Sequence, residues 1–238
     1  MNVSTHSRQL FKLILEDSMQ NAHVKGRTTR RNHFTAGTCL RTVQNAGVFC
    51  ICFYLLTFFL CTEARGFEQF NANREYDRYF SKYAKRYFGP GFDWRYFKAQ
   101  AAAESGLNAH ATSPVGARGI MQIMPPTFAE IKQKSPGDIL GAMEDARWNI
   151  AAGIRYDRSL WNLWKAPRPF QDRMDFMFGA YNAGKGTLLR AQKKAEALGI
   201  NPNLWTSMET VLPDVTGHHS RETIGYVNKI KTIKEILE

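Results

Sequence analysis

Apolar residues recur at helical spacing from residue 72 to residue 237, and this pattern constrains the fold more than any other feature. In the last segment, an aliphatic residue stands at every third position from Ile224 to Ile236. Comparable patterns predict helices over 72–88, 94–105, 143–164, 170–182, 186–198 and 220–237, and a helix that opens at Pro125. Alternating strand patterns after residue 65 are limited to a short turn or hairpin at 113–120. The sequence therefore predicts a mainly α fold.

One carboxylic acid stands at the end of an alanine-rich helix. Ala101, Ala102 and Ala103 precede Glu104 and leave room for close packing, and Gly106 ends the helix. A carboxyl group there is either exposed to solvent or desolvated in a cleft. In a cleft, its pKa rises, because burial and the negative end of the helix dipole both disfavour its charge. Such a group can serve as a general acid near neutral pH.

Four motifs give this acid a context. They read Glu-Ser-Gly-Leu-Asn at 104–108, Ser-Pro-Val-Gly-Ala-Arg-Gly-Ile-Met-Gln-Ile-Met-Pro at 113–125, Ala-Tyr-Asn-Ala-Gly at 180–184 and Glu-Thr-Ile-Gly-Tyr-Val at 222–227. In this order and spacing, they resemble the soluble lytic transglycosylase family of peptidoglycan-cleaving enzymes, in the goose-lysozyme-like superfamily. The resemblance covers about residues 75–238, and the tail around Tyr226 looks most like the membrane-associated branch. It implies a lysozyme-like single catalytic domain.

The resemblance implies a reaction that needs only one protein carboxylate. Glu104 matches the family's catalytic acid, which protonates the glycosidic oxygen between MurNAc and GlcNAc and then takes the proton of the substrate's own C6 hydroxyl. The product is a 1,6-anhydro-MurNAc end, and no water, metal or cofactor takes part. No spacing of Cys and His in the chain resembles a zinc site.

The resemblance also implies a set of substrate-binding residues. They are the hydroxyl beside the acid, two groove residues, an aromatic hydroxyl near the acid with its neighbour, and two residues of the groove wall: Ser105, Gln122, Met124, Tyr181, Asn182, Glu222 and Tyr226. Gln122, Met124, Tyr181 and Glu222 each have a purely structural alternative. Met124 is of a residue type that often fills gaps in cores, and Glu222 is equally typical of a helix start.

Two other functions stay open at the level of sequence. A lysozyme-type muramidase would need a second carboxylate across the cleft, for which Asp145, Asp175 and Glu209 are candidates. A non-catalytic glycan-binding or scaffold domain would keep the groove without the reaction. We expect peptidoglycan strands and no nucleic acid as the partner; the formal net charge of +11 alone does not separate these two anionic polymers.

The N-terminal part differs in composition from the rest. Residues 46–61 carry no charge, which is typical of a signal peptide or a short anchor, and residues 1–45 carry five more basic than acidic side chains. We interpret 1–45 as a basic cytoplasmic or mis-started segment, 46–64 as a signal peptide or membrane anchor, and 65–238 as the catalytic domain. Basic residues before an apolar segment favour an N-terminus in the cytoplasm, which places the catalytic domain in the periplasm or cell envelope. The four cysteines all precede residue 62, so an exported domain needs no disulfides.

Overall fold

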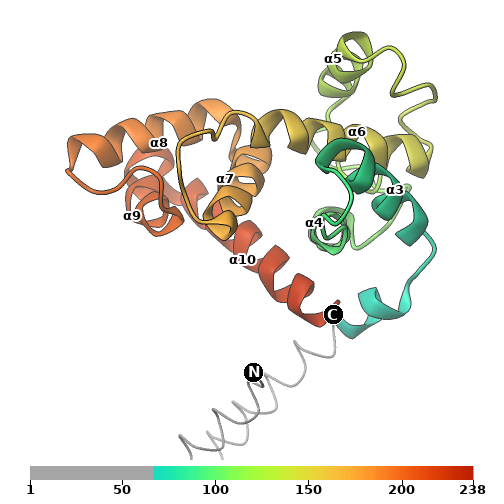
Figure 1. The fold of residues 1–238 in the computed structure, drawn as a ribbon, viewed down its shortest axis with the longest axis horizontal. Coiled ribbons are helices and arrows are strands. Elements are labelled where there is room, and N and C mark those ends of the chain that lie inside the picture. Colours follow the sequence, from blue (N-terminus) through green and yellow to red (C-terminus); the bar gives the residue numbers. More distant parts are fainter. Residues whose placement is uncertain (1–66, 238) are drawn as a thin grey trace, which may run out of the picture. The chain divides into compact units, whose positions relative to one another are not determined.

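The computed structural model describes residues 67–237, and this part of the chain is mainly helical (Figure 1). Residues 67–72 form a first helical segment. The named helices that follow are α3 (Asp77–Phe88), α4 (Arg95–Ser105), α5 (Pro125–Lys134), α6 (Ala146–Trp161), α7 (Phe170–Ala183), α8 (Lys185–Ala197), α9 (Trp205–Thr216), the short 3-10 helix η1 (Gly217–His219) and α10 (Ser220–Ile236).

Two helices organise the packing. Helix α6 lies against α3, α5 and α7, and α10 runs diagonally past α9 and α7 to α4 (Figure 1). The buried side of α6 includes small residues, Ala151 and Ala152, which allow neighbouring helices to approach closely. On α4, Phe97 and three alanines are also buried. The core therefore surrounds the helix that carries Glu104.

The observed helices agree closely with those expected from the sequence in most places. Helix α7 begins at Phe170 and α5 begins at Pro125, both as predicted. The first predicted helix is interrupted by a turn, in which Asn73 accepts a hydrogen bond from the backbone N–H of Glu75 at 3.2 Å. Helix α9 was not expected, because Pro213 lies inside it and proline disfavours helix interiors.

The segment at 113–120 forms a turn rather than a full hairpin. Single antiparallel bridges join Thr112 to Arg118 and Arg118 to Ile123, and within residues 67–237 no longer strand is formed. Two hydrogen bonds between the Arg118 and Ile123 backbones, both at 3.0 Å, close this loop just before α5 begins in the sequence. The loop is thus fixed by local backbone pairing and by its contacts with α6.

The segments assigned to the N-terminal region, 1–45 and 46–64, lie outside the described residues. In the part that is described, no helix combines the length and apolar character needed to cross a membrane.

Candidate active site

Glu104 lies in the last turn of α4, where the chain turns away from the helix. Gly106 ends α4 with a positive φ of 65°, a conformation that glycine adopts without strain. The hydroxyl of Tyr226, on α10, donates a hydrogen bond of 2.6 Å to Oε1 of Glu104. One helical turn further along α10, Lys229 donates to the backbone oxygen of Ala103 at 2.9 Å. Helix α10 therefore holds the last turn of α4 at the acid and at the residue before it.

The surroundings raise the pKa of the Glu104 carboxyl to about 7, from an ordinary value of 4.5. Burial is the main cause, because it disfavours the charged form, and the negative charge of Glu222 adds to it. The hydrogen bond from Tyr226 and the positive charge of Lys229 act in the opposite direction. The result is an acid that gains and loses its proton close to neutral pH.

The loop after the Glu104 motif is attached to α4 and α7 through its backbone carbonyls. Ser105 donates to the backbone oxygen of Ile120 at 2.8 Å, and the hydroxyl of Tyr181 donates to that of Met121 at 2.8 Å. Met121 itself is fully buried and packs against Gly153, where an added Cβ would lie only 2.8 Å from the methionine side chain. Ser105 and Tyr181 thus position the loop beside the acid.

Gln122 has an unusual backbone conformation within this loop. Its φ is +46°, in the left-handed region that side chains other than glycine rarely adopt. Its side-chain amide donates to the backbone oxygens of Gly119 at 2.8 Å and Ala111 at 3.1 Å, which stabilises the turn. Met124, two residues later, keeps 39% of its surface exposed. Met124 is therefore available to a ligand, whereas the amide nitrogen of Gln122 is engaged in the loop.

The other two predicted residues lie where the end of α7 meets the start of α10. Oδ1 of Asn182 accepts a hydrogen bond of 2.9 Å from Thr223, which ties the end of α7 to α10. The adjacent Glu222 is exposed over 71% of its side chain and lies 4.0 Å from the ring of His219. Glu222 therefore acts on Glu104 through its charge across the surface, whereas Asn182 is a link between helices.

The structure does not pair Glu104 with any of the three carboxylates that a hydrolytic mechanism could use. Asp145 caps the N-terminus of α6, and Asp175 is buried in an ion pair of 2.7 Å with Lys231. The charges that shift the pKa of Glu104 do not include those of Asp145, Asp175 or Glu209. A carboxylate that does interact with Glu104 through its charge, Asp157, is completely buried and is not accessible to water.

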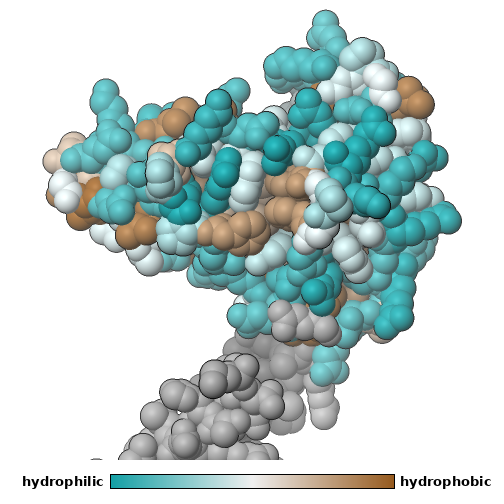
Figure 2. Space-filling model, viewed as in Figure 1, coloured by the Kyte–Doolittle hydropathy of each residue, from teal (hydrophilic) through white to brown (hydrophobic). Residues whose placement is uncertain are grey.

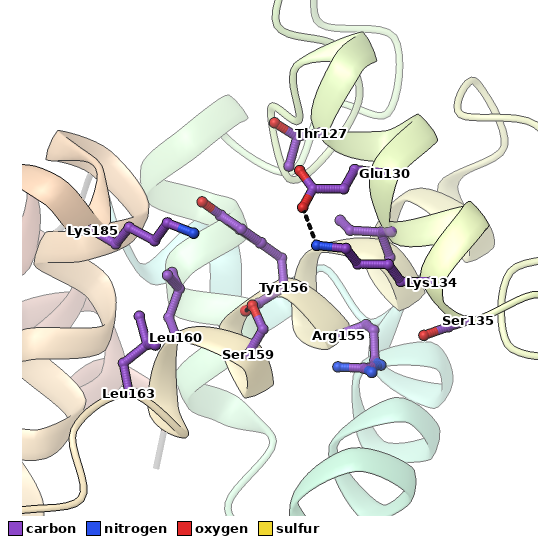
Figure 3. Close-up of a pocket in the computed structure, with 11 residues that line it drawn as sticks. Thr127, Glu130, Lys134, Ser135, Arg155, Tyr156, Ser159, Leu160, Leu163 and Lys185 are labelled. Carbon is purple, nitrogen blue, oxygen red and sulfur yellow. Dashed lines mark hydrogen bonds and ion pairs between the residues drawn. The ribbon is translucent and has the colours of Figure 1, made fainter.

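A cavity of about 310 Å³ opens next to this site, between α5, α6 and α8. Lys185 extends into it from α8, Tyr156 from α6, and Glu130 and Lys134 from α5 (Figure 3). Figure 2 shows the surface notched between the α8 and α5 sides of the molecule. Glu104 does not line the cavity, but the ring of Tyr156 contacts the ring of Tyr181 edge-on at 5.4 Å. The cavity is therefore linked to the site through the contact between Tyr156 and Tyr181.

Asn149 also supports the site, although its role did not follow from the sequence. Its side chain is fully buried in α6 and accepts from the backbone N–H of Met121 at 2.9 Å. It also donates to the backbone oxygens of Arg118 and Met143, each at 3.0 Å. A Cβ at Gly119, whose φ is +77°, would lie 2.3 Å from this amide. The available signal in the sequence was a lone asparagine among the apolar residues of a predicted helix. Within residues 67–237, His, Cys, Asp and Glu form no cluster of three suited to a metal ion.

The chain is similar to known lytic transglycosylases in both sequence and structure. It is 37% identical over 142 residues to the membrane-bound lytic murein transglycosylase F of Shewanella woodyi, which covers 59% of this chain and 28% of that protein. The corresponding protein of Shewanella sediminis is 32% identical over 157 residues, 64% of this chain and 31% of its own length. The chain thus spans less than a third of the length of these relatives.

A solved structure has a similar fold. The crystal structure of the 70 kDa soluble lytic transglycosylase of Escherichia coli matches with a TM-score of 0.52 and 28% sequence identity, over 68% of this chain and 24% of that one. The Transglycosylase SLT domain family matches residues 78–204, which include Glu104, the loop at 113–125 and Tyr181. This match extends over more than half of the chain, which therefore belongs to the Transglycosylase SLT domain family.

Proposed function

We propose that the domain is a peptidoglycan lytic transglycosylase, which cleaves the bond between MurNAc and GlcNAc and leaves a 1,6-anhydro-MurNAc end. The observation that carries this proposal is the state of Glu104. It is a partly buried acid with a pKa near 7 that is hydrogen-bonded to Tyr226, and none of Asp145, Asp175 and Glu209 is among the charges that act on it. One carboxyl group is enough when the substrate supplies its own nucleophile.

In the first step, protonated Glu104 gives its proton to the glycosidic oxygen, and the bond from that oxygen to C1 of MurNAc breaks. The carboxylate left behind then takes the proton of the C6 hydroxyl as that oxygen bonds to C1. The enzyme returns to its starting state, and no water is consumed. A pKa near 7 suits both steps, because an acid and its conjugate base are most effective together when the pKa lies close to the working pH.

We propose that the groove runs from Glu104 over the loop at 119–124 toward the cavity beside Tyr156. Met124 and the cavity offer exposed apolar and polar surface to the sugars. Ser105, Gln122 and Tyr181 would act mainly by holding the loop in place, as their hydrogen bonds suggest. Asn182, Glu222 and Tyr226 would form the opposite wall: Tyr226 contacts the acid, Asn182 joins α7 to α10, and Glu222 presents a charge to the solvent.

We further propose that the protein works in the cell envelope. The relatives from Shewanella carry the name membrane-bound lytic murein transglycosylase, which fits a domain held near the wall. The uncharged run at 46–61 would be a signal peptide or an anchor, with the basic residues before it on the cytoplasmic side and the domain of 65–238 exported.

Mass spectrometry of the soluble products released from purified peptidoglycan tests the proposed reaction. The full chain should release muropeptides that are one water lighter than hydrolysis products, and the Glu104→Gln variant should release none. Glu209→Gln serves as the matched control, because it removes a carboxylate on α9 outside the proposed site. Ordinary reducing MurNAc ends would indicate a hydrolase. No product from the unmutated chain, with retention on insoluble peptidoglycan, would favour a binding domain.

A further inference from the structure

Behind the catalytic acid, a buried carboxyl group meets a buried amide. Asp157 on α6 and Gln100 on α4 are both completely inaccessible to solvent. Nε2 of Gln100 donates a hydrogen bond of 3.3 Å to Oδ1 of Asp157. Gln100 stands four residues before Glu104 and thus on the same face of α4. The contact between Asp157 and Gln100 therefore joins the two helices one turn before the acid.

The remaining oxygens of this pair have no hydrogen-bond partner. Oδ2 of Asp157 and Oε1 of Gln100 are both buried and unpaired. An ionised aspartate offers only acceptors, so it leaves Oδ2 of Asp157 and Oε1 of Gln100 unsatisfied. Unsatisfied buried polar atoms are strongly destabilising, and folded proteins avoid them. A proton on Asp157 supplies the missing donor, because a carboxylic acid and a primary amide can form two hydrogen bonds to each other.

We propose that Asp157 is a neutral carboxylic acid which, paired with Gln100, positions Glu104 without placing a second negative charge beneath it. The part of the proposal that concerns positioning rests on the function proposed above. The protonation state of Asp157 does not depend on that function.

The titratable groups around Asp157 come from four helices: Glu104 from α4, Tyr156 from α6 itself, Tyr181 from α7 and Tyr226 from α10. Burial raises the pKa of Asp157 well above its ordinary value, and the negative charge of Glu104 raises it further, whereas the hydrogen bond from Gln100 acts in the opposite direction. A negative charge on Asp157 also raises the pKa of each of the three tyrosines. In the described part of the chain, Asp157 takes part in no ion pair with a Lys, Arg or His that would offset these effects.

The neutral state matters for the second step of the proposed reaction. An ionised Asp157 would repel the charge on Glu104, so the acid would hold its proton to higher pH. Glu104 could then not readily become the base that accepts the proton of the C6 hydroxyl. A protonated Asp157 provides the same contact between α4 and α6 without this repulsion.

A difference infrared spectrum of the full chain and its Asp157→Asn variant at about pH 8 tests the protonation state directly. The unmutated chain should show the carbonyl band of a protonated carboxylic acid that the variant lacks. Asp138→Asn is the matched control, since Asp138 is ion-paired with Arg86 and its replacement should remove only carboxylate bands. Loss of carboxylate bands alone in Asp157→Asn would overturn the proposal. If that variant does not fold, the unmutated chain labelled with ¹³C at its aspartate carboxyl groups replaces it. One resonance should keep the shift of a neutral acid at about pH 8, and its absence would likewise overturn the proposal.

The pH dependence of kcat/KM tests the positioning role. Asparagine keeps the shape and both hydrogen bonds of the neutral pair, so the alkaline limb for Asp157→Asn should move by less than about half a pH unit. An ionised aspartate predicts a larger movement to lower pH, because the substitution would then remove a negative charge beside Glu104. Asp157→Ala leaves Gln100 without a partner and should lower both kcat and the melting temperature. A chain inactive in every form, with the infrared band present, would refute the proposed function and leave the protonation state of Asp157 supported.

Discussion

Tyr226 opposes the effect of burial on the pKa of Glu104 through a single hydrogen bond of 2.6 Å. The phenol donates to the carboxylate, which stabilises the charged form and lowers the pKa of Glu104. A hydrogen bond to a charged group contributes about 1.5–3 kcal/mol. At 1.36 kcal/mol per pH unit, Tyr226→Phe should therefore raise the pKa of Glu104 by about one to two units. The alkaline limb of kcat/KM against pH should move upward by that amount.

The hydroxyl of Tyr79 provides the control for this prediction. It lies on α3, where it accepts a hydrogen bond from the neighbouring Arg78 and not from the site. Tyr79→Phe should leave the alkaline limb in place. If Tyr226→Phe leaves it in place as well, the hydrogen bond does not set the pKa of the acid.

At the level of elements, α6 holds the loop at 118–121 through one side chain. Removing the amide of Asn149 leaves the N–H of Met121 and the oxygens of Arg118 and Met143 without this partner. Each buried group left unsatisfied is destabilising by about 1–3 kcal/mol. Asn149→Ala should therefore lower the free energy of unfolding by about 3 kcal/mol or more, as measured by urea denaturation. It should also lower kcat, because the loop no longer has a fixed position beside Glu104.

Asn162→Ala is the matched control for this effect. Asn162 follows the end of the same helix and is exposed. Its replacement should change the free energy of unfolding by less than about 0.5 kcal/mol. Equal losses for the two variants would mean that the buried amide has no special role.

The helices differ in how well their own sequence predicts them. Helix α7 was predicted to within one residue at its end, because buried side chains repeat along it and a glycine follows it. Helix α9 was missed because Pro213 and the residues Asn201-Pro202 before it resemble a loop, although Trp205, Met208 and Leu212 bury one face. Local signals of this kind cannot reveal burial that depends on neighbouring helices.

The candidate site, like the helices, could be predicted only in part from the sequence. The motifs identified Glu104 and Tyr226, but their contact joins positions 122 apart in sequence and depends on how α10 packs on α4. Asp157 was not singled out, because a carboxylate in a helix is usually exposed and only tertiary packing around α6 buries this one. A local pattern identifies residues, whereas their protonation states follow from tertiary packing.

For the whole molecule, the raised pKa of Glu104 makes stability depend on pH. The folded state binds the proton of Glu104 more tightly, with a pKa of about 7 against 4.5, than the unfolded chain does. The free energy of unfolding therefore falls as the pH rises from about 4.5 to 7, and the loss remains at higher pH. At 1.36 kcal/mol per unit, with allowance for the partial exposure of the side chain, the loss is about 2–3 kcal/mol.

Glutamine removes the titration while keeping the shape of the side chain. Glu104→Gln should therefore match the unmutated chain in stability at about pH 4 and exceed it by about 2–3 kcal/mol at about pH 8, in urea denaturation at both values. Glu209→Gln should show no such growing difference. A gain for Glu104→Gln that is equal at both pH values would mean that packing, not ionisation, causes it. A gain that is absent at about pH 4 and present at about pH 8 would show that the ionisation of the buried Glu104 is destabilising, as expected for an acid that the fold holds protonated.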